Sequence, residues 1–369
     1  MKLSVGIVGL PNVGKSTLFN ALTKKSVPAE NYPFCTIDPS VGVVAVPDLR
    51  VGLLSQFSNS AKTLPAAIEF VDIAGLVKGA SAGEGLGNQF LSNIREVDAI
   101  AEVVRLFEDP NIIHVDGKVD PTSDIDVINL ELILADMQTV SKRLANIERD
   151  VKRGDKDAVA EKNALAKINA GLEAGNLASS IVLDENELVA VRGMHLLTMK
   201  PILYVLNKKA GARNLDKYQS DGGDERWQKL KQFLDEKKCQ YVFVDAGVEN
   251  ELSSFDGDEK ETFRKELGVS DDGINDLIKK SYEMLGLITF LTTGEDETRA
   301  WTILRGATAP EAGTAIHTDF KDKFIRAEVV FWKDLLDSGS YAKAREKGFV
   351  RTEGKEYVVK DGDVIEFKI

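Results

Sequence analysis

The sequence predicts an α/β protein whose mostly parallel sheet is covered by helices on both faces. Short apolar runs alternate with helical stretches, and the first run enters a glycine-rich loop that leads directly into a helix. The alternation stops over residues 123–199, and short strands with turns fill residues 285–369. We therefore predict an α/β domain over residues 1–122 and 200–284, a helical insertion between its two parts, and a separate carboxyl-terminal domain.

The strands expected in the parallel sheet are short apolar runs bounded by turn or charged residues. Runs of this length without polar alternation are typical of strands that are buried on both faces. They cover residues 3–9, 68–72, 99–106, 201–206 and 240–244. Helical stretches lie between several of them, and this alternation predicts the parallel arrangement.

The segment over residues 123–199 has a different periodicity. Its apolar residues recur at alternating steps of three and four, which is the spacing of a heptad seam. The seam consists of Leu130, Ile133, Met137, Val140, Leu144, Ile147 and Val151. After an interruption at Gly154, a second helix has compatible positions at Val159, Leu165, Ile168 and Leu172. We predict an inserted antiparallel α-helical coiled coil; the alternative is a pair of core helices packed on the sheet.

The carboxyl-terminal segment reads as a small α+β domain. Short strands separated by turn residues are expected over residues 287–291, 300–304, 326–330, 357–359 and 364–367. Residues 360–363 (Lys-Asp-Gly-Asp) predict a hairpin turn between the last two of these strands.

Composition limits the classes of function. With 369 residues, 43% of them hydrophobic and 29% charged, the chain is typical of a soluble protein of two or three domains. The net charge of −12 disfavours broad binding to nucleic acid, and we expect no DNA partner. No apolar run approaches the roughly 20 residues that span a bilayer, so no membrane partner is expected. The amino terminus reaches its glycine loop too early for a signal peptide, which favours a cytoplasmic location.

Residues 9–16 (Gly-Leu-Pro-Asn-Val-Gly-Lys-Ser) match the phosphate-binding pattern G-x-x-x-x-G-K-[ST] between a strand and a helix. The loop backbone should surround phosphate oxygens with N–H groups, and the helix directs its positive end at the same oxygens. Lys15 should reach the β- and γ-phosphates, Ser16 should hold Mg²⁺, and Thr17 should contact the α-phosphate. The loop residues expected to bind nucleotide are Gly9, Pro11, Asn12, Val13, Gly14, Lys15, Ser16 and Thr17.

Two further segments fit a nucleotide-sensing site. Residues 72–75 (Asp-Ile-Ala-Gly) follow a strand, so Asp72 should hold Mg²⁺ through water and the Gly75 N–H should sense the γ-phosphate. Thr36 lies in a proline-bounded loop that should order when its hydroxyl binds Mg²⁺ and the γ-phosphate. The glycine-rich residues 79–88 should form a second switch; the alternative is a passive linker.

These segments together resemble the translation-factor-related P-loop GTPases of the Obg branch, and more narrowly the YchF family of Obg-like ATPases. The resemblance covers essentially the whole chain. Its most specific motifs are residues 31–37 (Asn-Tyr-Pro-Phe-Cys-Thr-Ile), 83–91 (Gly-Glu-Gly-Leu-Gly-Asn-Gln-Phe-Leu), 107–115 (Phe-Glu-Asp-Pro-Asn-Ile-Ile-His-Val) and 299–303 (Arg-Ala-Trp-Thr-Ile). The family implies a G domain, an inserted coiled coil, a carboxyl-terminal TGS domain with a ubiquitin-like β-grasp fold, and association with ribosomes.

The segment expected to read the base departs from the GTPase pattern N-K-x-D. Residues 207–210 are Asn-Lys-Lys-Ala, so Ala210 replaces the carboxylate that accepts two guanine N–H groups. This loss predicts a preference for ATP, with relaxed discrimination as the alternative. Residues 244–247 (Val-Asp-Ala-Gly) form the second base loop, where Asp245 could supply a substitute carboxylate. The expected base contacts are Asn207, Lys208 and Ala246.

The catalytic residues are also unusual. Leu76 follows the D-x-x-G motif, where many GTPases carry a water-orienting glutamine, so slow intrinsic turnover is expected. Lys15 should stabilise the transition state, and Asn12 is a candidate ligand for a K⁺ ion. His114 could move in to orient water. The alternatives are a local loop hydrogen bond for Asn12 and a surface position for His114.

The function predicted from these features is Mg²⁺-dependent hydrolysis of ATP to ADP and phosphate by a regulatory switch. The resemblance implies that this switch acts on ribosomes, in translation or in a stress response. The ribosome or its RNA would contact either the coiled coil or the TGS domain. Basic residues of the latter are Lys321, Lys323, Arg326, Lys343, Arg345, Lys347, Arg351 and Lys355. The alternatives are a nucleotide-gated ribosome-binding module with incidental hydrolysis, and a conventional Obg-like GTPase.

Overall fold

The computed structural model describes residues 3–24, 38–73, 86–112, 114, 117–217, 223–252 and 273–369, with single positions 255, 259, 262, 263 and 266. The chain divides into two compact units. The larger unit comprises Ser4–Lys24 and Phe70–Ile274, and the smaller unit comprises Met1–Leu3, Lys25–Glu69 and Asn275–Ile369.

The larger unit is built on a parallel sheet. Strands β1 (Ser4–Val8), β5 (Ala99–Arg105), β7 (Ile202–Asn207) and β9 (Gln240–Val244) pair in parallel in that order, and β4 (Ala67–Asp72) lies beside β1. All five strands predicted for this sheet are present. Strand β5 is buried along its whole length, as its largely apolar run predicted.

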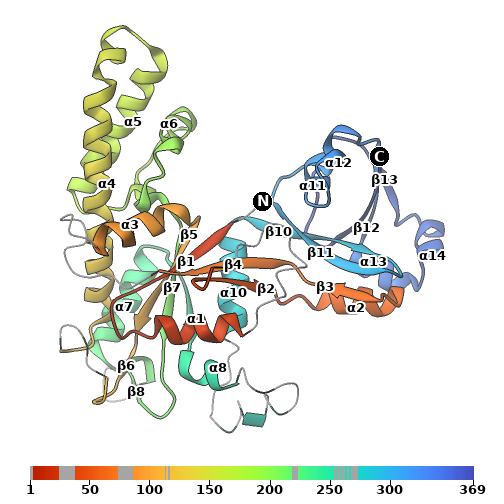
Figure 1. Cartoon of the computed structure of the whole chain (residues 1–369), viewed down its shortest axis with the longest axis horizontal. Coiled ribbons are helices and arrows are strands. Elements are labelled where there is room, and N and C mark those ends of the chain that lie inside the picture. Colours follow the sequence, from red (N-terminus) through yellow and green to blue (C-terminus); the bar gives the residue numbers. More distant parts are fainter. Residues whose placement is uncertain are drawn as a thin grey trace. The chain divides into compact units, whose positions relative to one another are not determined.

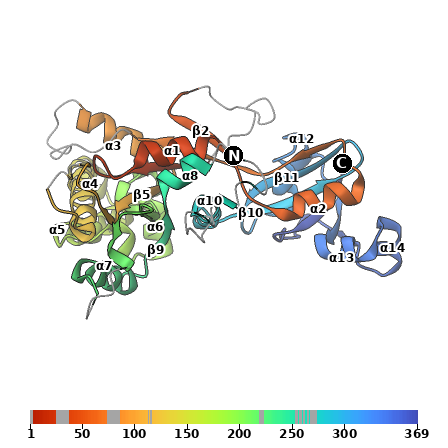
Figure 2. The same ribbon diagram turned by 90° about the horizontal axis from the view of Figure 1, so that it is seen from below.

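Helices cover both faces of this sheet (Figure 2). Helices α1 (Lys15–Thr23) and α8 (Ala246–Leu252) pack together on one face. The start of α4 (Pro121–Lys152) and α7 (Glu225–Glu236) pack on the other, around a core of β5 and β7 side chains. Helix α3 is Leu86–Glu96. Strands β6 (Phe107–Glu108) and β8 (Arg213–Asn214) form a small antiparallel pair beyond the sheet.

The helical insertion is a hairpin of α4 and α5 (Lys156–Glu173), which run side by side in Figure 1. The Asp120 side chain caps α4 by accepting the Ser123 N–H, and the Asp155 side chain caps α5. Gly154 adopts φ 78° between the two helices, where a glycine avoids strain. Helix α6 (Glu185–Val191) and the 3₁₀ turns Ala178–Ser180, Arg192–Met194 and Leu197–Met199 return the chain to β7.

Most of the predicted seam forms the core of this hairpin. Ile133, Val140 and Ile147 of α4 are buried against Leu165 and Ile168 of α5. Two predicted members lie outside the core: Leu130 is 54% exposed and Val159 is 39% exposed. The first turns of α4 pack on the sheet instead, so the seam begins only where the helix leaves the sheet.

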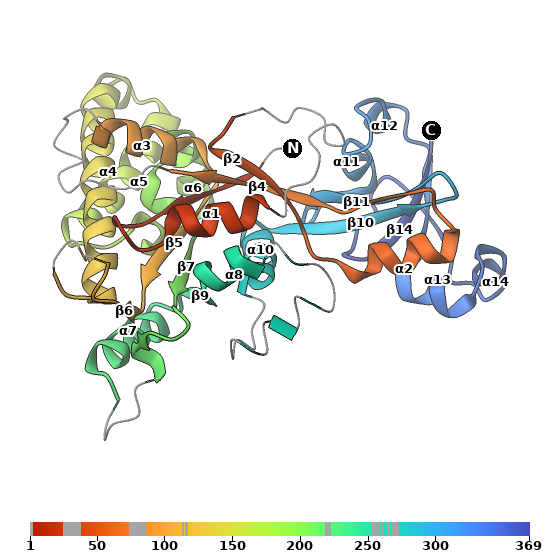
Figure 3. The same cartoon turned by 60° about the horizontal axis from the view of Figure 1, so that its bottom comes forward.

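The smaller unit contains a mixed sheet of order β13-β12-β14-β10-β11-β3. Its strands are β3 (Lys62–Leu64), β10 (Leu287–Thr293), β11 (Glu297–Leu304), β12 (Arg326–Phe331), β13 (Arg351–Glu353) and β14 (Asp363–Lys368). Helix α2 (Leu49–Ser58) covers one face, and α11 (Ala309–Gly313) and α12 (Asp319–Asp322) cover the other (Figure 3). Helices α13 (Trp332–Ser338) and α14 (Tyr341–Glu346) follow β12. Strand β2 (Val41–Ala45) pairs with β4, and helix α10 (Gly273–Met284) precedes β10.

Two features of the smaller unit differ from the sequence prediction. The strand predicted over residues 357–359 is wrong, because Val358 makes only an isolated bridge to Thr308 and residues 351–353 form the strand. Strand β3 pairs in parallel with β11, although it precedes β11 by more than 200 residues. The four predicted domain limits stay a prediction. They assigned residues 49–64 to the α/β domain, whereas these residues lie in the smaller unit. Within the described residues, no helix is both long enough and apolar enough to cross a membrane.

Candidate nucleotide site

The loop between β1 and α1 requires the two glycines of its motif. A Cβ atom on Gly9 would lie 2.7 Å from the Val103 carbonyl oxygen. Gly14 adopts φ 103°, and a Cβ atom there would lie 2.3 Å from Nδ2 of Asn207. Asn12 also adopts a positive φ of 63°. The loop therefore has a tight left-handed path that larger side chains at positions 9 and 14 would prevent.

The amino end of α1 is free to bind an anion. Gly14 is its N-cap, no side chain of the described residues caps it, and its first turn contains no acidic residue. Four N–H groups at the start of a helix lack partners within the helix, and they carry partial positive charge. A phosphate group is a chemically suitable partner for them.

Lys15 brings a buried cation to this position. Its side chain is only 9% exposed, and Nζ donates a hydrogen bond to the Leu10 carbonyl oxygen at 2.8 Å. Burial lowers the Lys15 pKa to about 8, and the charge of Asp72 partly opposes this shift. Burial also raises the Asp72 pKa. Two charged groups are thus partly desolvated beside an uncapped helix end, which is typical of a ligand site.

The remaining predicted loop residues differ in exposure. Ser16 and Asn12 are exposed, Pro11 and Thr17 are half-buried, and Val13 is buried. The Ser16 hydroxyl and the Asp72 carboxylate are hard oxygen donors of the kind that Mg²⁺ prefers. Thr36 and Gly75, the other residues predicted to sense Mg²⁺ or the γ-phosphate, lie outside the described residues, as does Leu76.

Asn207 connects the phosphate loop to the base loops. Its Nδ2 donates to the Val13 carbonyl oxygen at 2.8 Å, and its Oδ1 accepts the Ala246 N–H at 3.1 Å. Lys208 pairs with Asp216, and its Nζ lies 4.4 Å from the centre of the Phe243 ring. The structure therefore brings the predicted residues Val13, Asn207 and Ala246 together at one end of the sheet.

The side chain of Ala210 offers no acceptor, as the sequence indicated. The carboxylate of Asp245 is already bonded to the backbone: Oδ2 accepts the Ala210 N–H and Oδ1 accepts the Val248 N–H at 3.0 Å. Sequence reasoning considered Asp245 only as a reader of guanine and missed this role. An aspartate directly before a helix is a known signal for an N-cap, so the bond to the Val248 N–H could have been predicted from the sequence.

His114 does not occupy a surface position. It is 6% exposed, and its Nε2 lies 3.1 Å from Oδ2 of Asp124 in the first turn of α4. Arg105, at the end of β5, donates from Nε to the Phe107 carbonyl oxygen at 2.9 Å and so supports the preceding loop. The alternative of an exposed loop histidine is therefore wrong, while the catalytic assignment of His114 stays a prediction.

Sequence reasoning also missed Glu102 in the middle of β5. Its side chain is fully buried, and neither carboxyl oxygen has a hydrogen-bond partner among the described residues. Burial, reinforced by the nearby charges of Asp124 and Asp126, raises the Glu102 pKa well above its usual range. A signal was available: Glu102 lies inside the run 99–106, which was predicted to be a strand buried on both faces.

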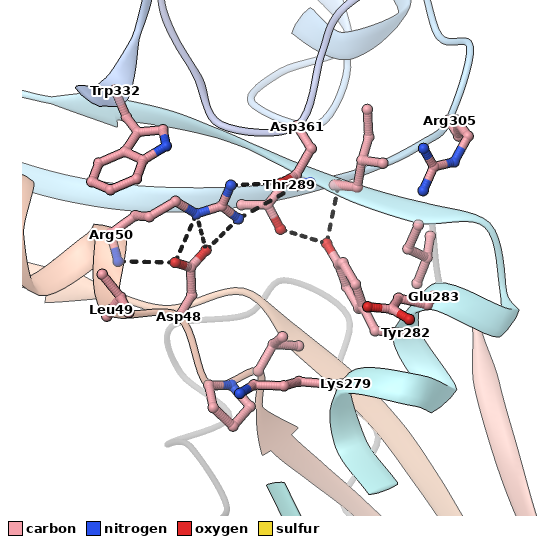
Figure 4. A pocket seen from close by; sticks show the side chains of 14 residues that line it. Asp48, Leu49, Arg50, Lys279, Tyr282, Glu283, Thr289, Arg305, Trp332 and Asp361 are labelled. Carbon is pink, nitrogen blue, oxygen red and sulfur yellow. Dashed lines mark hydrogen bonds and ion pairs between the residues drawn. The ribbon is translucent and has the colours of Figure 1, made fainter. Parts of the chain in front are cut away.

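The smaller unit contains a pocket of about 600 Å³ between α2, α10 and β10 (Figure 4). Arg50 lies at its centre and donates to Asp48 at 2.7 Å and to Asp361 at 2.6 Å. Asp361 also accepts the Thr289 N–H at 2.9 Å, and the Tyr282 hydroxyl donates to the Ile288 carbonyl oxygen at 3.0 Å. These polar groups satisfy one another, which is typical of a structural network.

The parallel sheet and the glycine loop ahead of α1 define the larger unit as a P-loop nucleotide-binding domain. A family model described as "50S ribosome-binding GTPase" matches residues 4–148. The carboxyl-terminal family model of the YchF GTPases, described as a protein of unknown function, matches residues 287–369.

The relatives cover the full chain. The ribosome-binding ATPase YchF of Bacillus subtilis is 52% identical over 100% of this chain and 99% of its own length. The protein of the same name from Escherichia coli O157:H7 is 47% identical over the same shares. The solved structure of the Schizosaccharomyces pombe YchF GTPase has a TM-score of 0.86 and 37% identity, and the match covers 100% of this chain and 98% of that one. The chain therefore belongs to the YchF family, which confirms the predicted family and fold class.

Proposed function

We propose that this chain is a Mg²⁺-dependent ATPase that acts as a nucleotide-dependent switch on the ribosome, in translation or in a stress response. The observation that carries the proposal is the buried ammonium of Lys15, the first residue of α1 at its uncapped end, which interacts electrostatically with Asp72. In the free protein, the interactions of the Lys15 ammonium do not fully offset the cost of its burial, which is why its pKa is lowered. Triphosphate oxygens would supply the missing favourable interactions.

In this proposal, the N–H groups at the start of α1 and the Lys15 ammonium hold the β- and γ-phosphates. Ser16 and Asp72 would hold Mg²⁺, which neutralises charge on the phosphates when it is bound. The fit is supported by Asp72, since a partly buried carboxylate with a raised pKa is stabilised by a nearby cation. Asn12, exposed in the loop, is the proposed ligand of a K⁺ ion.

His114 is the proposed water-orienting residue, because the position after the D-x-x-G motif is a leucine. In the structure, Asp124 contacts its imidazole, so His114 would have to leave this partner to reach a water at the γ-phosphate. This requirement agrees with the slow intrinsic turnover that we expect.

The preference for ATP over GTP rests on the base loops. Ala210 supplies no carboxylate, and both Asp245 oxygens accept backbone N–H groups. Guanine would leave two N–H donors without the acceptor that GTPases provide, whereas adenine lacks those donors. A conventional GTPase is therefore the less favoured alternative, although both family models and the solved structure carry the word GTPase in their names or descriptions.

The names of the relatives support the ribosome as partner. Ribosome binding would place the protein in the cytoplasm. The contact would be made by the α4–α5 hairpin or by the smaller unit, which is proposed to be a TGS domain. Several basic residues of that unit, among them Lys347, Arg351 and Lys355, are exposed.

The test measures ATP hydrolysis with and without ribosomes, together with co-sedimentation in the presence of ATP, ADP or no nucleotide. We expect hydrolysis to rise with ribosomes and ribosome affinity to depend on the nucleotide. Lys15→Ala should abolish both effects, while Lys231→Ala, at an exposed position of α7, should preserve them. Ribosome binding that is indifferent to nucleotide and to Lys15→Ala would instead support a binding module with incidental hydrolysis.

A further inference from the structure

One carboxylate ties together the two loops that flank the proposed base site. Asp245 lies between β9 and α8, and Ala210 lies in the loop after β7. Oδ1 of Asp245 accepts the Val248 N–H at 3.0 Å, and Oδ2 accepts the Ala210 N–H at 2.5 Å.

Helix capping explains only part of this arrangement. Asp245 directly precedes α8, so the bond from the Val248 N–H is that of an N-cap residue. The bond to Ala210 joins a residue 35 positions earlier, and a cap does not require it. A serine cap would satisfy the helix with one oxygen. The second oxygen of Asp245 therefore has a separate role between the loops.

The Ala210 N–H is presented by a tight turn. The Ala212 N–H donates to the Lys209 carbonyl oxygen at 3.2 Å, and Gly211 adopts φ 72°. This combination is typical of a type II turn with Ala210 at its second position. At the position where a guanine-reading loop carries an acceptor side chain, this loop thus has a backbone donor that is bonded to Asp245.

We propose that the bond from the Ala210 N–H to Asp245 keeps this carboxylate from accepting guanine N–H groups at the nucleotide site, an inference that rests on the proposed function. This bond holds the two base loops in one arrangement. The same bond occupies the oxygen that could otherwise accept guanine N–H groups. Discrimination against GTP then has two causes: the hydrogen bond between Asp245 and the Ala210 N–H, and the absence of an acid at position 210.

The sharpest test is Ala210→Pro, because proline suits the second position of a type II turn, lacks the N–H donor, and places its ring Cδ where the hydrogen was, which displaces the Asp245 carboxylate from Ala210. Dissociation constants for ATP and GTP are measured by equilibrium binding to the full chain. We expect the ratio of the GTP constant to the ATP constant to fall about tenfold, because a freed carboxylate can accept charge-assisted bonds from guanine. An unchanged ratio in folded Ala210→Pro would overturn the inference.

Two controls separate the tie from other causes. The double variant Ala210→Pro/Asp245→Ser lacks the freed carboxylate, so its ratio should return to the wild-type value; a ratio that stays low would overturn the inference. Asp245→Ser alone keeps the helix cap and loses the tie. It should weaken ATP and GTP binding alike, by roughly threefold to tenfold. Unchanged affinities would contradict a role of the Asp245–Ala210 bond in holding the two base loops, even if Ala210→Pro does not fold.

The ratio of the GTP constant to the ATP constant in the wild type tests the proposed ATP preference separately from the changes expected in the variants.

Discussion

The phosphate loop of the larger unit and the pocket of the smaller unit each contain a basic side chain near carboxylates, but the two are satisfied differently. Arg50 donates to both Asp48 and Asp361, and these partners raise its pKa despite its burial. Lys15 donates to a backbone carbonyl, and burial lowers its pKa to about 8. A charge whose partners are built into the fold serves stability, whereas one left short of partners is placed for a ligand.

Lys15→Ala should produce the largest effect. ATP hydrolysis should fall by about 10³-fold or more, because the ammonium stabilises charge on the transferred phosphoryl group. The thermal unfolding temperature should change little, since the wild-type side chain is desolvated without full compensation. Steady-state phosphate release and thermal denaturation of the same samples check both statements. If Lys15→Ala instead lost much stability and kept its hydrolysis, Lys15 would have the structural role that is assigned to Arg50.

His114→Ala should lower kcat by roughly 10- to 100-fold while ATP affinity is preserved, because a water-orienting group acts on the chemical step. Single-turnover hydrolysis and equilibrium binding separate the two quantities. His317→Ala is the matched control, as this histidine is exposed in the smaller unit. An unchanged kcat in His114→Ala would leave the contact with Asp124 as a structural one.

Arg50→Met should destabilise the smaller unit without changing hydrolysis. The substitution keeps the aliphatic stem and leaves the carboxylates of Asp48 and Asp361 without their cation, which should cost about 2 kcal/mol in free energy of unfolding. Urea denaturation measures this cost. Arg345→Met removes the exposed pair with Glu328 and should cost less than about 0.5 kcal/mol. Equal costs for the two variants would contradict the structural role of the Arg50 network.

The last prediction is a pH dependence. With its pKa lowered to about 8, Lys15 of the free protein loses its proton as the pH rises above that value. ATP affinity should therefore fall above pH 8, approaching tenfold per pH unit, because phosphate binding requires the charged form. The free energy of unfolding of the free protein should rise between pH 8 and 10.5, since the unfolded state then binds more protons.

Arg50 provides the contrast, because its guanidinium keeps its charge over this range. Binding titrations from pH 7 to 9.5 measure the dependence, and in Lys15→Arg it should disappear. An ATP affinity that is constant across this range would show that the Lys15 ammonium keeps its proton without a ligand.

Local patterns predicted the parallel sheet and the phosphate loop. Buried parallel strands are largely apolar runs, so β5 and β9 were found within one residue of their ends. The loop motif places its functional groups by backbone geometry, which eight consecutive residues determine. The helical hairpin was also predictable, because its seam has a regular period.

Features that depend on distant partners were not predictable. Strand β3 has three residues and pairs with β11 from the far end of the chain. Leu130 fits the heptad period but lies on a turn of α4 whose other face packs on the sheet. The bond of Asp245 to Ala210 arises only when separate elements meet. A sequence pattern shows which residues are available at such places, and the fold decides how they are used.

The most direct test of the proposed function is equilibrium binding of fluorescent ATP and GTP analogues, with Mg²⁺ and K⁺, to the wild-type chain and to Ala210→Asp. The account predicts tighter ATP binding by the wild type and a gain in GTP affinity in the variant, because the substitution restores a carboxylate to the loop after β7. Preferred GTP binding by the wild type would contradict the account and return the chain to the conventional GTPases.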